Sequence, residues 1–206
     1  MLELWVFALL VLLISVTIKI AVHSTSLVQG LIFCKKREIN KRNMFGLNGF
    51  EDPETWPRVS IIKPIVVDDP KVKSLIETYF QIDYPKYDIH FCFQSNSNSC
   101  INFVNQLAKQ YPKVKVFVHS SPLPTNFGNR KIMNATQAFS TVRGELIWIA
   151  DENIYAVVTS LKEMVTQFDE KDVACVHQLP LWKYRDSIEN SINMIFFYTH
   201  HSRFYL

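Results

Sequence analysis

The feature that most constrains this fold is an alternation of short apolar runs with helically spaced apolar residues between positions 59 and 177. The first run, VSIIKPIVV at 59–67, is almost continuously apolar, as in a strand buried on both faces. Asp68-Asp69-Pro70 follows and favours a helix start, because aspartate caps helices and proline fits a first turn.

The same alternation predicts further strands at 89–93, 114–119, 145–150 and 173–177, and further helices at 101–111, 130–142 and 157–168. Five strands separated by helices indicate an α/β fold with a mostly parallel sheet and right-handed crossovers. In such sheets, ligands bind in the crevice at the carboxyl ends of the strands. The residues that directly follow each strand are therefore the first candidates for function.

The N-terminus predicts a transmembrane helix. Fifteen residues from Leu4 to Ile18 carry no charge, and the apolar run resumes beyond Lys19 to Val22. About 19 helical residues reach roughly 28 Å, close to the hydrocarbon thickness of a bilayer. A cleaved signal peptide is the alternative, but no basic segment precedes the run and no small-residue cleavage site follows it. We therefore expect residues 1–24 to be an uncleaved anchor.

A basic flank follows the anchor. Residues 35–42 contain five positive charges and one negative charge, which places the N-terminus in the lumen and the following residues in the cytosol. Residues 1–50 carry a net charge of +4 and the whole chain +3, so the remainder is near neutral and shows no footprint for nucleic acid. We expect residues 25–58 to form a basic juxtamembrane segment and linker, and residues 59–206 the globular part.

Several chemistries are excluded by the motifs that are absent. The five glycines cannot form either of the two common glycine-rich phosphate-binding loops. The four cysteines include no C-x-x-C pair, so no zinc or redox motif is indicated. One glycosylation sequon is present, Asn134-Ala135-Thr136, and a glycan there would contradict a cytosolic domain.

Polar residues follow the second and fourth expected strands. Gln94 to Ser99 is a run of serine and asparagine, and Asp151-Glu152-Asn153 follows LIWIA. Carboxylates at this edge can hold Mg²⁺ or Mn²⁺ against a diphosphate, although an aspartate at a strand end can equally be a helix cap. Lys131 opens the helix after the long loop and either meets a phosphate or is an ordinary surface lysine.

An aromatic-rich helix is expected near the C-terminus, over residues 188–205. It can pack as a core helix or lie at a membrane surface. His200 and His201 lie about 100° apart on such a helix, which excludes them as a joint metal pair. One of them near the crevice can still bind substrate or transfer a proton.

Taken together, these motifs resemble ceramide glucosyltransferases, membrane-bound glycosyltransferases of the GT-A fold. The resemblance covers essentially the whole chain. The matching segments are VSIIKP at 59–64, LIETYF at 75–80 with IDYPKY at 82–87, Lys131-Ile132 with Asn134, LIWI at 146–149 with Asp151, and His201 with Arg203-Phe204-Tyr205.

The resemblance implies a Rossmann-like GT-A sheet that transfers glucose from UDP-glucose to ceramide, with inversion, on the cytosolic face of the Golgi. It implies that Asp151 engages Mg²⁺ or Mn²⁺ and the diphosphate, and that His201 and Arg203 lie at the donor and acceptor site. Ser95 stands where such enzymes have a nucleotide-contacting aspartate. A third aspartate, which serves as base, and a Q/R-x-x-R-W motif are expected beyond Leu206.

Three functions remain open from the sequence. The first is a ceramide glucosyltransferase family member, of which this chain is an incomplete form that does not make glucosylceramide alone. The second is a non-catalytic membrane-anchored module that binds a nucleotide sugar or a partner, which the uncharged Ser95 favours. The third is another membrane-bound inverting transferase that uses a polyprenyl phosphate, against which the His201 and Arg203 segment argues.

Overall fold

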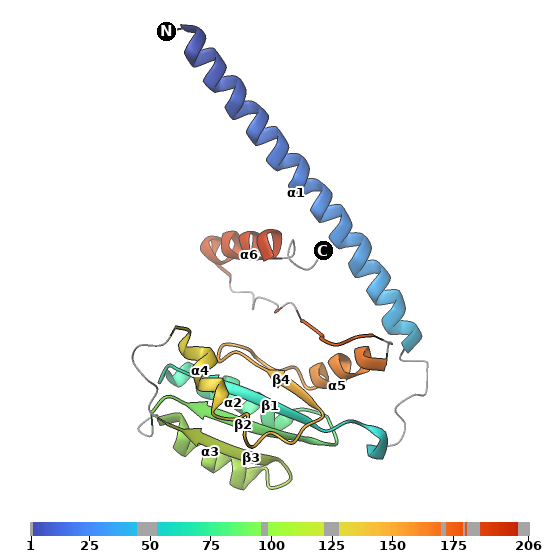
Figure 1. The fold of residues 1–206 in the computed structure, drawn as a ribbon, viewed down its shortest axis with the longest axis vertical. Coiled ribbons are helices and arrows are strands. Elements are labelled where there is room, and N and C mark those ends of the chain that lie inside the picture. Colours follow the sequence, from blue (N-terminus) through green and yellow to red (C-terminus); the bar gives the residue numbers. More distant parts are fainter. Residues whose placement is uncertain are drawn as a thin grey trace. The chain divides into compact units, whose positions relative to one another are not determined.

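The chain forms two units, Met1–Gly49 with Leu179–Leu206, and Phe50–Gln178. The computed structural model describes residues 2–44, 53–95, 99–121, 128–169, 172–178, 180 and 186–201. Within these described residues, the first unit contains two helices, and the second contains the sheet and its covering helices (Figure 1).

The first unit is dominated by α1 (Leu2–Met44), a helix of 43 residues. Its segment Trp5–Thr25 has a mean hydropathy of 2.5, and none of it is buried in the protein. This segment is long and apolar enough to cross a membrane, and the helix continues without a break through the expected basic flank. The second helix, α6 (Ile188–His201), covers most of the C-terminal helix that the sequence predicts.

The second unit is built on a parallel sheet of four strands in the order β3-β2-β1-β4. The strands are β1 (Val59–Ile65), β2 (Tyr87–Phe93), β3 (Lys115–Ser120) and β4 (Leu146–Ile149). All seven residues of β1 are buried, as its continuous apolar run predicts for a central strand. The α/β fold with a mostly parallel sheet is therefore confirmed.

The helices cover the sheet unequally. Face A is the face that carries Ile61 and Lys63, and face B is the face that carries Ile62. On face A, α2 (Pro70–Thr78), α3 (Ser99–Gln110) and α5 (Ser160–Val165) contribute buried residues to one core cluster with Ile61. On face B, α4 (Arg130–Thr136) and the following turns contribute Ala135 and Ala138 to a small cluster with Ile62.

The strand order explains this division. The chain winds from β1 through β2 to β3 with its helices on face A, and then returns over the sheet through α4 to β4 at the other edge. Because crossovers between parallel strands are right-handed, reversing the direction of winding puts the connecting helix on the opposite face. In doubly wound sheets, ligands bind at the carboxyl ends of the strands, at the point where the strand order reverses. In this sheet, that point lies at the carboxyl ends of the neighbouring strands β1 and β4.

Two sequence expectations about elements were wrong. The segment 173–177 forms no strand; Val176 instead packs against the core on face A. A strand needs a hydrogen-bonded neighbour as well as an apolar pattern. The helix expected over 130–142 ends as α-helix at Thr136 and continues as turns, in which Gln137 N, Ala138 N and Phe139 N donate to carbonyls three residues back.

Among the described residues, three short 3₁₀ segments accompany the helices. They are η1 (Pro53–Thr55), η2 (Tyr79–Gln81), which extends α2, and η3 (Thr166–Asp169), which extends α5. The helix starts follow their caps: Asp69 Oδ1 accepts from Lys71 N at 2.8 Å, and Asn129 Oδ1 accepts from Lys131 N at 3.0 Å. Proline at the first position of α2 agrees with the sequence expectation.

Candidate functional site

The residues that directly follow β4 form the centre of the site. Residues 151–154, here called the acidic turn, begin beside the end of β1, because Ala150 N donates to Ile62 O at 2.9 Å and prolongs the pairing of the two strands. The turn therefore stands at the reversal point between β1 and β4, where the strand order predicts a ligand.

Several hydrogen bonds hold the acidic turn against the rest of the sheet unit. Glu152 Oε2 accepts from Val66 N at 2.8 Å and from Val67 N at 3.2 Å, which ties the turn to the end of β1. Ile154 N donates to Asp151 O at 3.1 Å, and the Tyr79 hydroxyl donates to Ile154 O at 3.1 Å. The Glu152 carboxylate is thus engaged by the backbone, and the Asp151 carboxylate is the one that faces outward.

Lys63 lies beneath the acidic turn and was not singled out by the sequence analysis. Its side chain is fully buried, and Nζ donates to Asp151 O at 2.8 Å and to Glu152 O at 3.3 Å. Nζ also lies 4.2 Å from the centre of the Tyr79 ring. Burial lowers the pKa of Lys63 to about 7, although the Asp151 and Glu152 carboxylates oppose that fall. The only signal in the sequence was a lysine inside an otherwise apolar strand.

Lys131 and Asp151, two of the residues proposed from the sequence, meet in the structure. Lys131 Nζ lies 2.9 Å from Asp151 Oδ2, and the two side chains are 41% and 45% exposed. Ion pairs this exposed contribute about 0.2–1 kcal/mol. The carboxylate keeps its orientation through its other oxygen, Oδ1, which accepts from Glu152 N at 2.8 Å. The pair is therefore weak enough for either partner to take up a ligand instead.

Asn134 holds α4, the helix that carries Lys131, at the carboxyl ends of β1 and β2. The Asn134 side chain is fully buried, and Nδ2 donates to Ile65 O at 3.0 Å and to Cys92 O at 2.6 Å, at the ends of β1 and β2. An amide that is buried and doubly bonded in this way is not accessible to a glycosylating enzyme. The sequon at 134–136 therefore does not indicate a glycan in the folded protein.

Three further site residues were proposed from the sequence: Ser95, His201 and Arg203. Ser95 follows the end of β2 by two residues and is exposed. Nearby, Asp68 accepts from Ser99 N at 3.0 Å and from Ser99 Oγ at 2.6 Å, which lowers the pKa of Asp68. His201 ends α6 in the other unit, where only its backbone is described, and Arg203 lies outside the described residues.

The residues present fit a divalent cation only together with a phosphate ligand. Among the described residues, no group of three or more His, Cys, Asp and Glu side chains is arranged to hold a metal ion. Asp151 has one carboxylate oxygen, Oδ2, that contacts only the partly exposed Lys131 in the described part of the chain, and Glu152 is engaged by the backbone. Mg²⁺ sites of this kind use one or two protein carboxylates and complete their coordination with water and substrate phosphates.

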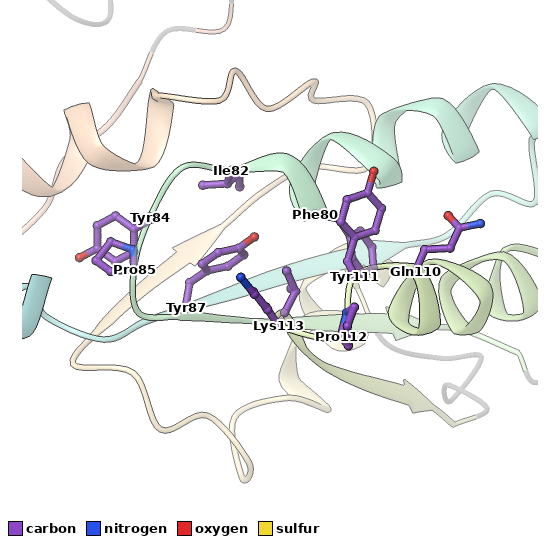
Figure 2. A pocket seen from close by; sticks show the side chains of 10 residues that line it. Phe80, Ile82, Tyr84, Pro85, Tyr87, Gln110, Tyr111, Pro112 and Lys113 are labelled. Atoms are coloured by element: carbon purple, nitrogen blue, oxygen red, sulfur yellow. The ribbon is translucent and has the colours of Figure 1, made fainter.

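A pocket of about 500 Å³ lies at the amino ends of the strands, near the start of β2 and β3. Figure 2 shows tyrosine rings and two prolines around it, with Lys113 beside them. Two of its hydroxyls are already used by the fold, since Tyr84 donates to Pro57 O at 2.7 Å and Tyr87 to Tyr79 O at 3.2 Å. The pocket lies at the amino ends of the strands, away from the carboxyl ends where a diphosphate site is expected.

Comparison with known proteins gives a consistent picture. Residues 18–206 match glycosyl transferase family 21. Two relatives from Caenorhabditis elegans are ceramide glucosyltransferase 1, 31% identical over 157 residues, and ceramide glucosyltransferase 3, 33% identical over 159 residues. Each alignment covers 76% of this chain and 34% of the relative. The chain thus spans about a third of the length of these curated relatives.

Among solved structures, the chain is similar to mannosyltransferase PcManGT from Pyrobaculum calidifontis, in complex with GDP-Man and Mn²⁺. The TM-score is 0.50 and the sequence identity 16%, and the match covers 77% of this chain and 47% of that one. At this identity, the likeness establishes the fold and not the ligand.

Proposed function

We propose, on the premise that this chain belongs to glycosyl transferase family 21, that its sheet unit binds UDP-glucose as the donor for glucosyl transfer to ceramide. The observation that carries the proposal is the Lys131 and Asp151 pair on the acidic turn, at the strand-order reversal. The two nematode relatives that are named ceramide glucosyltransferases support the choice of donor and acceptor.

The chemistry of the pair suits a nucleoside diphosphate. When the bond between glucose and the diphosphate breaks, negative charge develops on the leaving phosphate, and positive groups fixed nearby stabilise it. The Lys131 ammonium can leave Asp151 for a phosphate oxygen at little cost, because the exposed ion pair is weak. A Mg²⁺ or Mn²⁺ ion at Asp151 would add charge neutralisation through hard oxygen ligands. We assign Ser95, at the end of β2, to a hydrogen bond with the nucleotide.

We propose neither carboxylate of the acidic turn as the base that deprotonates the ceramide hydroxyl. Glu152 is engaged by Val66 N and Val67 N, and Asp151 by Lys131 and by the donor side of the site. His201 and Arg203 are proposed to contact donor and acceptor. The sheet unit is thus assigned to donor binding, and inversion at the sugar requires a base from outside the acidic turn.

We further propose a Golgi membrane location with the N-terminus luminal and the sheet unit cytosolic. The apolar segment Trp5–Thr25 and the basic residues after it support this orientation. Labelling of Cys175, which is exposed, tests it in a Cys34→Ser background. A membrane-impermeant thiol reagent should label Cys175 in intact Golgi vesicles, because the outer surface of these vesicles is their cytosolic face. Labelling from the luminal side would contradict the orientation.

Donor binding is tested by titrating UDP in Mn²⁺ into the detergent-solubilised chain and its Asp151→Ala variant. We expect the variant to bind at least about tenfold more weakly, equal to about 1.4 kcal/mol. Asp83→Ala is the matched control, because Asp83 is an exposed aspartate in the turn before β2. If wild type and Asp151→Ala bind UDP equally, the role given to Asp151 is wrong.

A second candidate, a non-catalytic membrane-anchored module that binds a nucleotide sugar, is favoured by Ser95. A serine can hydrogen-bond a nucleotide but carries no charge. Expression of the chain in cells that lack glucosylceramide synthesis tests whether the chain itself turns over. Glucosylceramide above a vector control supports the transferase and excludes the module, whereas UDP binding without any product agrees with both candidates, because the chain spans about a third of the relatives' length.

A further inference from the structure

Lys63 is an ionisable side chain at a position of β1 where the neighbouring face A residues are apolar. It lies in the central strand on face A, between Ile61 and Ile65, and all three side chains are fully buried. A buried ammonium is unfavourable unless it is paired, and an apolar residue of similar size would pack here without that penalty. Conflicts between a local pattern and the fold are concentrated at functional sites.

The partners of Lys63 show what it holds. Both oxygens that accept from Nζ, Asp151 O and Glu152 O, are main-chain atoms of the acidic turn. The Tyr79 ring, 4.2 Å from Nζ, forms the opposite wall, and the Tyr79 hydroxyl bonds to the same turn at Ile154 O. Lys63 therefore binds the backbone of the turn from inside the protein, while the Asp151 carboxylate points the other way, toward Lys131.

The two lysines approach the turn from different sides. Lys63 donates to the main-chain oxygens of Asp151 and Glu152 from inside the protein, and Lys131 pairs with the Asp151 carboxylate at the outer side. When Lys131 turns to a phosphate, Lys63 still donates its hydrogen bonds to the turn.

From this geometry we propose that Lys63 is a positioning residue for donor binding: it fixes the acidic turn so that Asp151 faces the diphosphate, without touching the donor itself. The inference rests on the proposed function of Asp151. It predicts that loss of Lys63 weakens binding of UDP with Mn²⁺ and also loosens the acidic turn in the protein without ligand.

The test compares Lys63→Met with wild type in the full detergent-solubilised chain. Methionine has a similar length but neither a charge nor a hydrogen-bond donor. We expect the affinity for UDP in Mn²⁺ to fall by about tenfold or more, as when groups that orient a metal ligand are removed. Ile61→Val is the control, because Ile61 lies on the same strand and face, and its variant should bind within about twofold of wild type.

Hydrogen exchange of the ligand-free proteins gives a readout that does not depend on donor binding. In Lys63→Met, amides of the peptide that spans residues 151–156 should exchange faster, while β2 keeps its protection. Should Lys63→Met fail to fold, Tyr79→Phe removes the other tether, the bond from the Tyr79 hydroxyl to Ile154 O, and keeps the ring. It should show the same two changes at smaller size.

The outcomes separate this inference from the function on which it rests. If wild type binds no UDP but exchange at 151–156 still rises in Lys63→Met, Lys63 holds the turn and the proposed donor is wrong. If the variant that folds binds UDP within about twofold of wild type, Lys63 is not a positioning residue and the inference is overturned. Unchanged exchange at 151–156 would overturn it equally.

Discussion

Two buried polar clusters lie on opposite faces of the same sheet and differ in the atoms that accept their hydrogen bonds. The Lys63 cluster consists of Lys63 and Tyr79, and the His90 cluster consists of Asp88, His90 and His119. The Lys63 cluster on face A ends on main-chain carbonyls of the acidic turn, at the carboxyl edge. The His90 cluster on face B ends on side chains within the sheet and its cover: His90 Nε2 lies 3.0 Å from Asp88 Oδ1, and His90 Nδ1 lies 3.0 Å from His119 Nε2. Only the first cluster is connected to the candidate site.

The hydrogen bonds of the His90 cluster run from Asp88 through His90 to His119, and Arg58 Nη1 lies 3.7 Å from the other carboxylate oxygen of Asp88. The Asp88 carboxylate accepts, so His90 Nε2 donates, and neutral His90 then accepts at Nδ1 from His119 Nε2. Thr141 Oγ1, on the turns after α4, lies 3.3 Å from His90 Nδ1 and 3.5 Å from His119 Nε2. A buried polar group therefore acts on function through the atoms to which it is hydrogen-bonded, and burial alone does not identify a site.

Among the changes that distinguish the two clusters, Asp88→Ala is expected to cause the largest loss of stability. This change leaves the buried N–H of His90 without its acceptor and should lower the free energy of unfolding by about 1–3 kcal/mol, while UDP affinity stays within about twofold of wild type. Urea unfolding and UDP titration of the same sample measure both quantities. Asp83→Ala, an exposed aspartate, controls for the substitution. A tenfold loss of UDP affinity in Asp88→Ala would remove the distinction.

Acid pH should give the next largest effect. Burial lowers the pKa of His90, and burial together with the neighbouring His90 lowers the pKa of His119. Because both values lie below the unfolded value of 6.5, stability is complete above pH 6.5 and falls as the pH drops through 6.5 toward the folded pKa values. The free energy of unfolding should fall by up to about 1.4 kcal/mol per pH unit for each histidine.

Urea unfolding between pH 7.5 and about pH 5 checks this effect. A His90→Leu, His119→Leu double variant should lose most of the slope, since no titrating imidazole remains in the cluster. The lowered pKa of Lys63, about 7, acts mainly at more alkaline pH and does not produce the slope in acid. Equal slopes in wild type and the double variant would show that other groups dominate acid unfolding.

The smallest effect is expected from Thr141→Val. Thr141 Oγ1 donates to Ala138 O at 2.9 Å, and its contacts with the two histidines are longer. Its removal should lower stability by under about 1 kcal/mol. Thr136→Val is a close control, because Thr136 makes the same bond three residues back, to Met133 O, away from the histidines. If both variants lose the same stability, Thr141 contributes nothing to the cluster.

Much of the fold followed from local patterns, and the failures were at positions where a partner decides the structure. The apolar run of β1, the Asp69 cap and the parallel α/β fold were all predicted correctly, because each depends on neighbouring residues in the sequence. The segment 173–177 has the composition of a strand, but the described structure gives it no pairing partner. The end of α4 at Thr136 likewise depends on how its turns pack over face B.

The site was predicted less completely, for the same reason. Asp151 and Lys131 were proposed because of their places after a strand and at a helix start, and the structure brings them together. Lys63 could not be connected with them, since its contact depends on the register that pairs Ile62 with Ile149, almost 90 residues away. The contact of His90 with His119 depends on the register between β2 and β3 in the same way.

The most direct measurement of the central claim is one series of UDP titrations in Mn²⁺, on wild type, Asp151→Ala, Lys63→Met and Asp88→Ala. The first two substitutions should weaken binding by about tenfold or more, and Asp88→Ala should leave it within about twofold despite its lower stability. Binding that weakens in all three variants in proportion to their loss of stability would make the two clusters equivalent and overturn the roles given to Asp151 and Lys63.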